Sequence, residues 1–148
     1  MPTLEWRCVS ADDAVSELIR FVSRGRVSHI EFVFGAVSLG AHADGGVARR
    51  PLNNYPVDLR YQAVCTDEQY AAAMAFLEAQ IGKPYDFADI ADIVADRDWH
   101  DPSRWICSEL WIAALEAAKI VGAIDGSINL FTPEDGLIVS GAMFEKLQ

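Results

Sequence analysis

Residues 105–115 constrain the fold of this chain more than any other stretch, because they form an apolar run with a cysteine near its start. The spacing of the Ile, Leu and Ala residues in this run predicts a helix. The turn-forming segment Asp101-Pro102-Ser103 precedes it, so we expect Cys107 to lie in the first helical turn. Unpaired backbone N–H groups at that end of a helix favour a thiolate. Cys107 is therefore a candidate nucleophile, and the alternative is a small buried core residue.

Length and charge limit the classes of protein to which the chain can belong. Its 148 residues, 51% of them hydrophobic, predict one domain that spans residues 1–148. The formal net charge of −10 argues against nucleic-acid partners and anionic membrane surfaces. We find no apolar run long enough to span a membrane, and charged residues stand where a signal peptide would be apolar. We therefore expect a cytoplasmic protein.

The cysteine pattern argues against disulfide bonds and bound metal. Cys8, Cys65 and Cys107 are an odd number of thiols, and none belongs to a CxxC or CxxH motif. We therefore expect reduced thiols, no metal site and no cofactor.

The order of the periodic segments indicates a single α+β domain with no internal repeat. Alternating apolar residues predict strands at 4–9, 27–34, 37–42 and 57–65, with a short extended segment at 47–50. Helical spacing predicts helices at 10–23, 66–82 and 85–94, a cysteine-led helix that ends near Gly122, and a last helix capped by Thr132.

The strand at 27–34 has one apolar face and one polar face. Because residues two apart on a strand share a face, His29 and Glu31 lie side by side. Histidine is the commonest general base, and a carboxylate beside it can fix its ring orientation. The alternative is that both merely line a solvated sheet face. His42, on the following strand, is a competing orienting group because an antiparallel register can bring it opposite His29.

Four short motifs, in this order, resemble the permuted papain-like hydrolases of the NlpC superfamily, with the YaeF/YiiX-type group as the nearest match. They are Ser28-His29-Ile30-Glu31-Phe32-Val33, then Leu39-Gly40-Ala41 with Gly45-Gly46-Val47, then Gly82-Lys83-Pro84-Tyr85-Asp86-Phe87, and Trp105-Ile106-Cys107-Ser108-Glu109-Leu110. In that group the histidine strand precedes the nucleophile helix. The resemblance covers residues 27–135 and implies an antiparallel sheet packed against helices, with the nucleophile at a helix N-terminus.

The resemblance also implies roles for individual residues. Cys107 is the expected nucleophile, His29 the general base, and Glu31 or, as second choice, His42 the third catalytic residue. Tyr85 is either a second oxyanion donor beside the Cys107 backbone N–H or a packed aromatic wall. Either Arg49 and Arg50 receive a substrate carboxylate or they form a solvated turn.

The expected reaction is hydrolysis of an amide or ester bond through a thioester, with no cofactor. NlpC-type relatives typically cut peptidoglycan stem peptides, and permuted relatives include lipid acyltransferases. The expected partner is therefore a small molecule, a peptide or an acyl amide. A phage or mobile-element origin fits the lack of an export signal. The alternative function is a non-catalytic binding or structural module on the same scaffold, in which Cys107 is an ordinary buried thiol.

Overall fold

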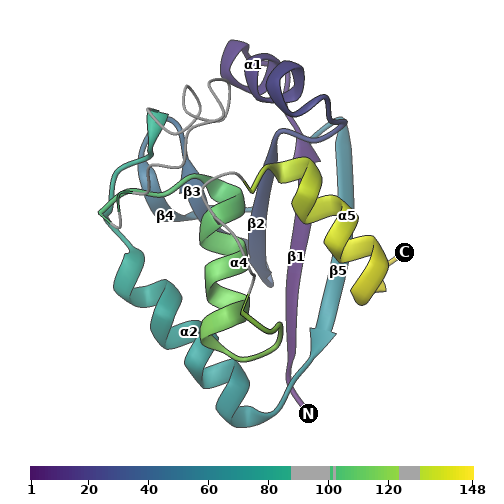
Figure 1. Cartoon of the computed structure of the whole chain (residues 1–148), viewed down its shortest axis with the longest axis vertical. Coiled ribbons are helices and arrows are strands. Elements are labelled where there is room, and N and C mark those ends of the chain that lie inside the picture. Colours follow the sequence, from purple (N-terminus) through teal and green to yellow (C-terminus); the bar gives the residue numbers. More distant parts are fainter. Residues whose placement is uncertain (88–100, 102, 124–130) are drawn as a thin grey trace.

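A computed structural model describes residues 1–87, 101, 103–123 and 131–148 of the chain as an α+β fold. A six-stranded antiparallel sheet and four helices make up the described part, and the α+β class that the sequence predicts is confirmed (Figure 1). The strands are β1 (Thr3–Ser10), β2 (His29–Phe34), β3 (Val37–His42), β4 (Gly46–Pro51), β5 (Val57–Val64) and β6 (Glu145–Lys146). The helices are α1 (Ala14–Ser23), α2 (Asp67–Gln80), α4 (Cys107–Ala117) and α5 (Pro133–Met143).

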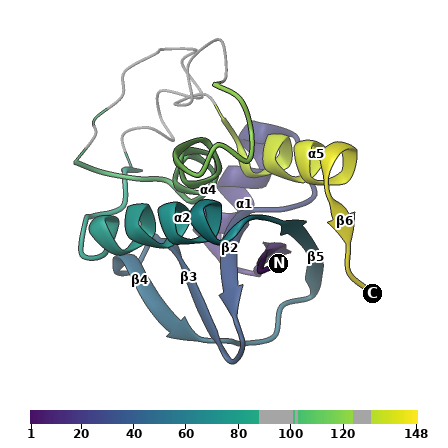
Figure 2. The same ribbon diagram turned by 90° about the horizontal axis from the view of Figure 1, so that it is seen from below.

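The strand order is β4-β3-β2-β1-β5-β6, so β1 and β2 lie at the centre of the sheet. Helices α2, α4 and α5 cover one face of this sheet, whereas α1 lies across one of its ends (Figures 1 and 2). Among the described residues, no helix is long and apolar enough to cross a membrane.

The core between the sheet and the helices is centred on Trp6 of β1. Its indole contacts the rings of Trp111 in α4 and Phe32 in β2, at centroid distances of 5.5 and 6.5 Å. The indole N–H donates to the hydroxyl of Ser140 in α5 over 2.8 Å, so its one polar atom is paired. Such contacts join both central strands to the helical layer, and they fix where α4 begins relative to β2.

Local sequence signals placed several element ends correctly. Gly35, with φ of 62°, and Ala36 form the two-residue turn that joins β2 to β3. Thr66 caps α2 by accepting from the backbone N–H of Gln69, and Thr132 caps α5 in the same way. Pro51 lies in β4, an edge strand, where its missing N–H breaks no ladder.

Other predicted boundaries are wrong for identifiable reasons. Ser10 ends β1 instead of starting a helix, and α1 is capped by Asp13, which accepts from the Ser16 N–H over 2.9 Å. Helix α4 ends at Ala117 rather than near Gly122, because Lys119 adopts the left-handed conformation with φ of 55°. The short strand β6 was not predicted, because two residues carry no periodicity.

The helix predicted for residues 85–94 is wrong at its first residue and otherwise lies almost wholly outside the described residues. Tyr85 forms an isolated parallel β-bridge with Trp105. This bridge joins the segment after α2 to the segment that leads into α4, so it fixes Tyr85 close to the start of α4.

Candidate active site

The side chains of His29 and Glu31 project from the same side of β2, and they contact each other. Nε2 of His29 lies 3.2 Å from Oε2 of Glu31, within hydrogen-bond distance. Ile30 and Phe32, which alternate with them along the strand, face the helical layer instead. The alternation predicted from sequence therefore holds, but Glu31 is 1% exposed, so it does not line a solvated sheet face.

Arg7 of β1, which is fully buried, holds the other oxygen of Glu31. Its Nε donates to Oε1 of Glu31 over 2.7 Å, and Cα pairing places the two residues directly opposite each other. The guanidinium also donates to the side-chain and backbone oxygens of Asn53 and to Asp58. The sequence does not reveal the role of Arg7, because a polar residue at every second position is usual in a strand with one exposed face.

These contacts keep Glu31 ionised. Burial alone raises the pKa of a carboxyl, but hydrogen bonding to His29 and the charges of His29 and Arg7 lower that of Glu31 to about 2. A permanent negative charge therefore lies against the imidazole of His29 across the physiological pH range. Such a charge favours the protonated ring and fixes its orientation.

Cys107 is the first residue of α4, as the sequence predicts. Its helix is capped by Glu109, whose Oε2 accepts from the Ile106 backbone N–H over 3.4 Å. The hydroxyl of Ser108 donates to the carbonyl of Phe131 just before α5. Ser108 and Glu109 therefore hold the start of α4 in place. The first backbone N–H groups of this helix have no acceptor within the helix itself.

The thiol of Cys107 and the imidazole of His29 interact. Burial lowers the pKa of His29, but the charge of Cys107 and hydrogen bonding to Cys107 and Glu31 together raise it to about 10. The ring thus has an acidic neighbour on two sides, the thiol and the carboxylate. This arrangement favours the protonated imidazole of His29.

His42, at the end of β3, lies beside the same cluster. The β2–β3 register, in which Phe32 pairs with Leu39, continues toward the strand ends to place His42 across from His29, and the centroids of the two rings are 4.9 Å apart. Its Nε2 is 3.7 Å from Oε2 of Glu31, has no hydrogen-bond partner and is buried. Burial first, then the charges of His29 and Arg50, lower the pKa of His42 to about 4, so its ring is neutral at pH 7.

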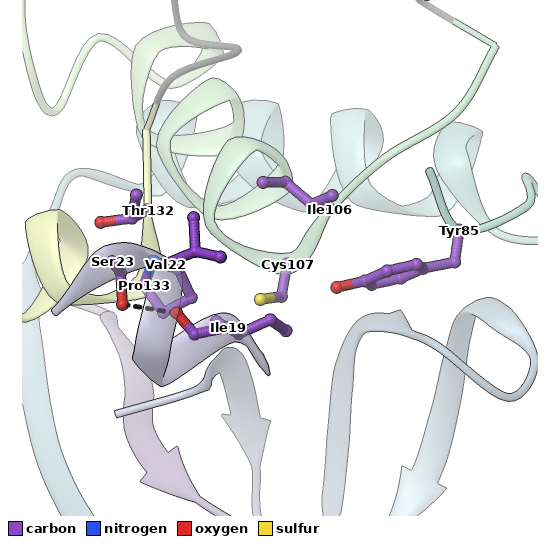
Figure 3. Close-up of a pocket in the computed structure, with 8 residues that line it drawn as sticks. All are labelled: Ile19, Val22, Ser23, Tyr85, Ile106, Cys107, Thr132 and Pro133. Carbon is purple, nitrogen blue, oxygen red and sulfur yellow. Dashed lines mark hydrogen bonds between the residues drawn. The ribbon is translucent and has the colours of Figure 1, made fainter. Parts of the chain in front are cut away.

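Two cavities meet at this cluster. A small one of about 20 Å³ lies against Cys107 and is lined by apolar residues of α1 and by Tyr85 (Figure 3). In this view the hydroxyl end of Tyr85 points toward the Cys107 sulfur. A larger cleft of about 590 Å³ lies against His29 and His42. Ile19 and Tyr85 line both, so they separate the thiol from the larger cleft.

The structure separates the two arginines that the sequence treats as one candidate. Arg50 lines the larger cleft and pairs with Asp44 over 2.7 Å. Arg49 pairs with Glu78 of α2, and it does not line this cleft. Only Arg50 can meet a ligand that lies beside His29.

Comparison with known proteins adds no family to this picture, because neither a family model nor a curated protein sequence matches the chain.

Proposed function

We propose that this chain is a thiol hydrolase with a circularly permuted papain-like fold of the NlpC type. The observation that carries the proposal is the position of the His29 imidazole, which interacts with the Cys107 thiol and with the Glu31 carboxylate. A nucleophile, a base and a group that orients the base are the three parts of a thiol active site. The histidine-first chain order and the antiparallel sheet under a cysteine-led helix support the same conclusion.

Each group has a defined task in the reaction. Because Nε2 of His29 is engaged by Glu31, Nδ1 is the ring nitrogen left to take the thiol proton. The thiolate of Cys107 attacks the carbonyl carbon of an amide or ester, and the imidazolium returns its proton to the leaving amine or alcohol. Water then attacks the thioester with His29 as the base, which releases the acid and restores the thiol.

Charge that develops on the carbonyl oxygen needs donors near the start of α4. The backbone N–H of Cys107 is one donor, because the first N–H groups of a helix have no partner within it. The hydroxyl of Tyr85 is the second, since this side chain lines the same cavity as the thiol. We assign the third catalytic role to Glu31 rather than His42, because Oε2 of Glu31 lies within hydrogen-bond distance of His29, whereas Nε2 of His42 has no hydrogen-bond partner.

The larger cleft indicates the class of substrate. Its volume of about 590 Å³ suits a small peptide or an acyl amide, such as a cell-wall stem peptide. Arg50 supplies a positive charge for a carboxylate in that cleft.

Alkylation by iodoacetamide at pH 6, read by mass spectrometry for each cysteine, tests the reactive thiol. At this pH an ordinary thiol of pKa about 8.5 is less than about 1% thiolate. The controls lie within the same chain, because burial raises the pKa of Cys8 to about 12 and also raises that of Cys65. We expect Cys107 to react at least about 100-fold faster than either of them.

Substitution of His29 by Gln should remove this advantage, because the imidazolium that stabilises the thiolate is gone. The substrate is then sought by incubating the protein with a mixture of muropeptides and acyl amides, with Cys107→Ala as the blank. Equal reactivity of all three cysteines in the unmodified chain, with no product absent from the blank, would sink the hydrolase proposal.

A non-catalytic module is the second candidate, and one observation favours it. Cys107 is 2% exposed, and the cavity in front of it, about 20 Å³, holds about one water molecule. A substrate carbonyl requires α1 or Tyr85 to move aside. A thiol that stays unreactive at every pH, in a chain that binds a muropeptide without cleaving it, identifies this second function.

A further inference from the structure

The side chains of His29, Glu31 and His42 form a second kind of site, distinct from the thiol. Their nitrogen and oxygen donor atoms all lie within 4.8 Å of one another. Oε2 of Glu31 lies 3.2 Å from Nε2 of His29 and 3.7 Å from Nε2 of His42. Neighbouring ligands of a tetrahedral zinc ion, with bonds of about 2.1 Å, lie about 3.4 Å apart. The two distances to Oε2 of Glu31 are therefore close to the spacing of zinc ligands.

The state of His42 points in the same direction. A buried polar atom normally has a hydrogen-bond partner, yet Nε2 of His42 has none and faces Glu31. The side chain is 8% exposed, so ordinary bulk solvent does not satisfy it. An imidazole whose buried ring nitrogen has no other partner is placed to bind a metal ion.

One carboxylate oxygen of Glu31 is available to a metal ion, although Arg7 binds the other. Arg7 contacts only Oε1, and its charge is shared with Asp58 and with the oxygens of Asn53. Oε2 faces the two imidazoles. Both histidines line the larger cleft, so an ion has access from solvent and room for a water ligand.

We propose that His29, Glu31 and His42 bind a divalent transition-metal ion of the Zn²⁺ class, and that the bound ion switches off the thiol chemistry of Cys107. Two imidazoles and a carboxylate suit zinc, with water in the fourth position. An ion on Nε2 of His29 would replace its hydrogen bond to Glu31 and displace the proton from that nitrogen, so the neutral ring carries its one proton on Nδ1, the nitrogen that otherwise accepts from Cys107. The ring can then no longer take a proton from Cys107. Binding does not rest on the proposed hydrolase function, whereas the inhibition does.

Equilibrium binding of Zn²⁺ in competition with a chromophoric chelator tests the site. The Cys107→Ala chain is used, so that the thiol contributes no affinity. We expect one ion per chain. His42→Ala, made in that background, should weaken binding at least about tenfold, because loss of even an outer-shell partner costs about 10- to 100-fold. His100→Ala, which removes the remaining histidine of the sequence, is the matched control and should change nothing.

A spectroscopic measurement covers the case in which the His42 variant does not fold. Co²⁺ added to the Cys107→Ala chain should give the visible absorption of a four- or five-coordinate nitrogen and oxygen site, and Zn²⁺ should displace it. No stoichiometric binding, no such absorption, or equal loss of affinity in the His100 variant each overturns the proposal.

The inhibition is tested separately in the chain that retains Cys107. One equivalent of Zn²⁺ should slow alkylation of Cys107 at least about tenfold, and a chelator should restore it. His42→Ala should require a higher Zn²⁺ concentration for the same effect. If zinc slows alkylation equally in both chains, the ion sits on the thiol and the proposed site is wrong. Binding without any thiol reactivity in the metal-free chain instead overturns the hydrolase function and leaves the metal site standing.

Discussion

The two sides of the central strands β1 and β2 are both buried, yet they are stabilised by opposite means. On the side that faces the helices, Trp6 and Phe32 pack in an aromatic core. On the other side, Arg7 and Glu31 form a charged pair of which 0% and 1% of the side chains are exposed. A substitution on the apolar side costs folding free energy in proportion to the apolar area that it removes from the core. A buried charge, by contrast, depends on one particular partner of opposite charge. The polar side is therefore the fragile one, and it is the side that carries His29 and Glu31.

The largest effect should come from breaking the charged pair. Replacing Arg7 by Met leaves the Glu31 carboxylate buried without its guanidinium, which should lower the free energy of unfolding by about 3–5 kcal/mol. Chemical denaturation measures this change. The matched control is Arg60→Met, since Arg60 is 36% exposed and pairs with Asp58 and Glu5 at the surface. Exposed pairs are worth at most about 1 kcal/mol, so equal losses in the two variants contradict the assigned role of Arg7.

The next largest effect is the acid sensitivity that His42 confers. Its folded-state pKa of about 4 lies below the ordinary 6.5, so the unfolded chain binds the proton more readily as pH falls below 6.5. Stability should therefore fall by up to about 3 kcal/mol between pH 6.5 and 4.5. Unfolding curves in a buffer that contains a chelator measure it.

Glu31 and His29 should contribute little to the change in stability between pH 4.5 and 6.5. Glu31, with a pKa lowered to about 2, contributes stability that is fully present above its unfolded value of 4.5 and is lost below it. His29, with a pKa raised to about 10, contributes stability that is fully present below 6.5 and is lost as pH rises through 10. His42→Gln should thus flatten the slope between pH 4.5 and 6.5. An unchanged slope in that variant shows that another group titrates there.

The difference between the two sides also explains what the sequence can reveal. Alternation of apolar residues, helix caps at Thr66 and Thr132 and the glycine turn at Gly35 are local signals, and they place most elements. The pairing of His29 with Glu31 is local too, since the two residues are two apart on one strand. Arg7 reaches Glu31 only through the β1–β2 register, and Asn53 only through a loop that folds over it. No spacing within the chain encodes these contacts.

A smaller effect is expected on the apolar side. Trp6→Phe removes the indole hydrogen bond to Ser140 and leaves a small cavity against Trp111, which should cost about 2 kcal/mol. The hydroxyl of Ser140 still donates to the Gly136 carbonyl over 2.7 Å, so no buried donor is stranded. The alkylation rate of Cys107 and the slope of stability below pH 6.5 should stay as they are. A change in either would mean that the two sides of the sheet are coupled.

The smallest effect concerns Arg50 and Arg49, neighbours that face different surroundings. Both side chains are partly exposed and paired, so replacing either by Gln should change stability by less than about 1 kcal/mol.

The effects of the two substitutions on substrate binding should differ. Because only Arg50 lines the cleft beside His29, Arg50→Gln should raise KM about tenfold for an amide substrate that carries a carboxylate. Arg49→Gln should leave KM unchanged, and neither variant should affect a matched substrate without the carboxylate. Equal KM values for both variants on the acidic substrate show that the carboxylate is bound elsewhere, since Arg50 is the arginine that lines the larger cleft in the described part of the chain.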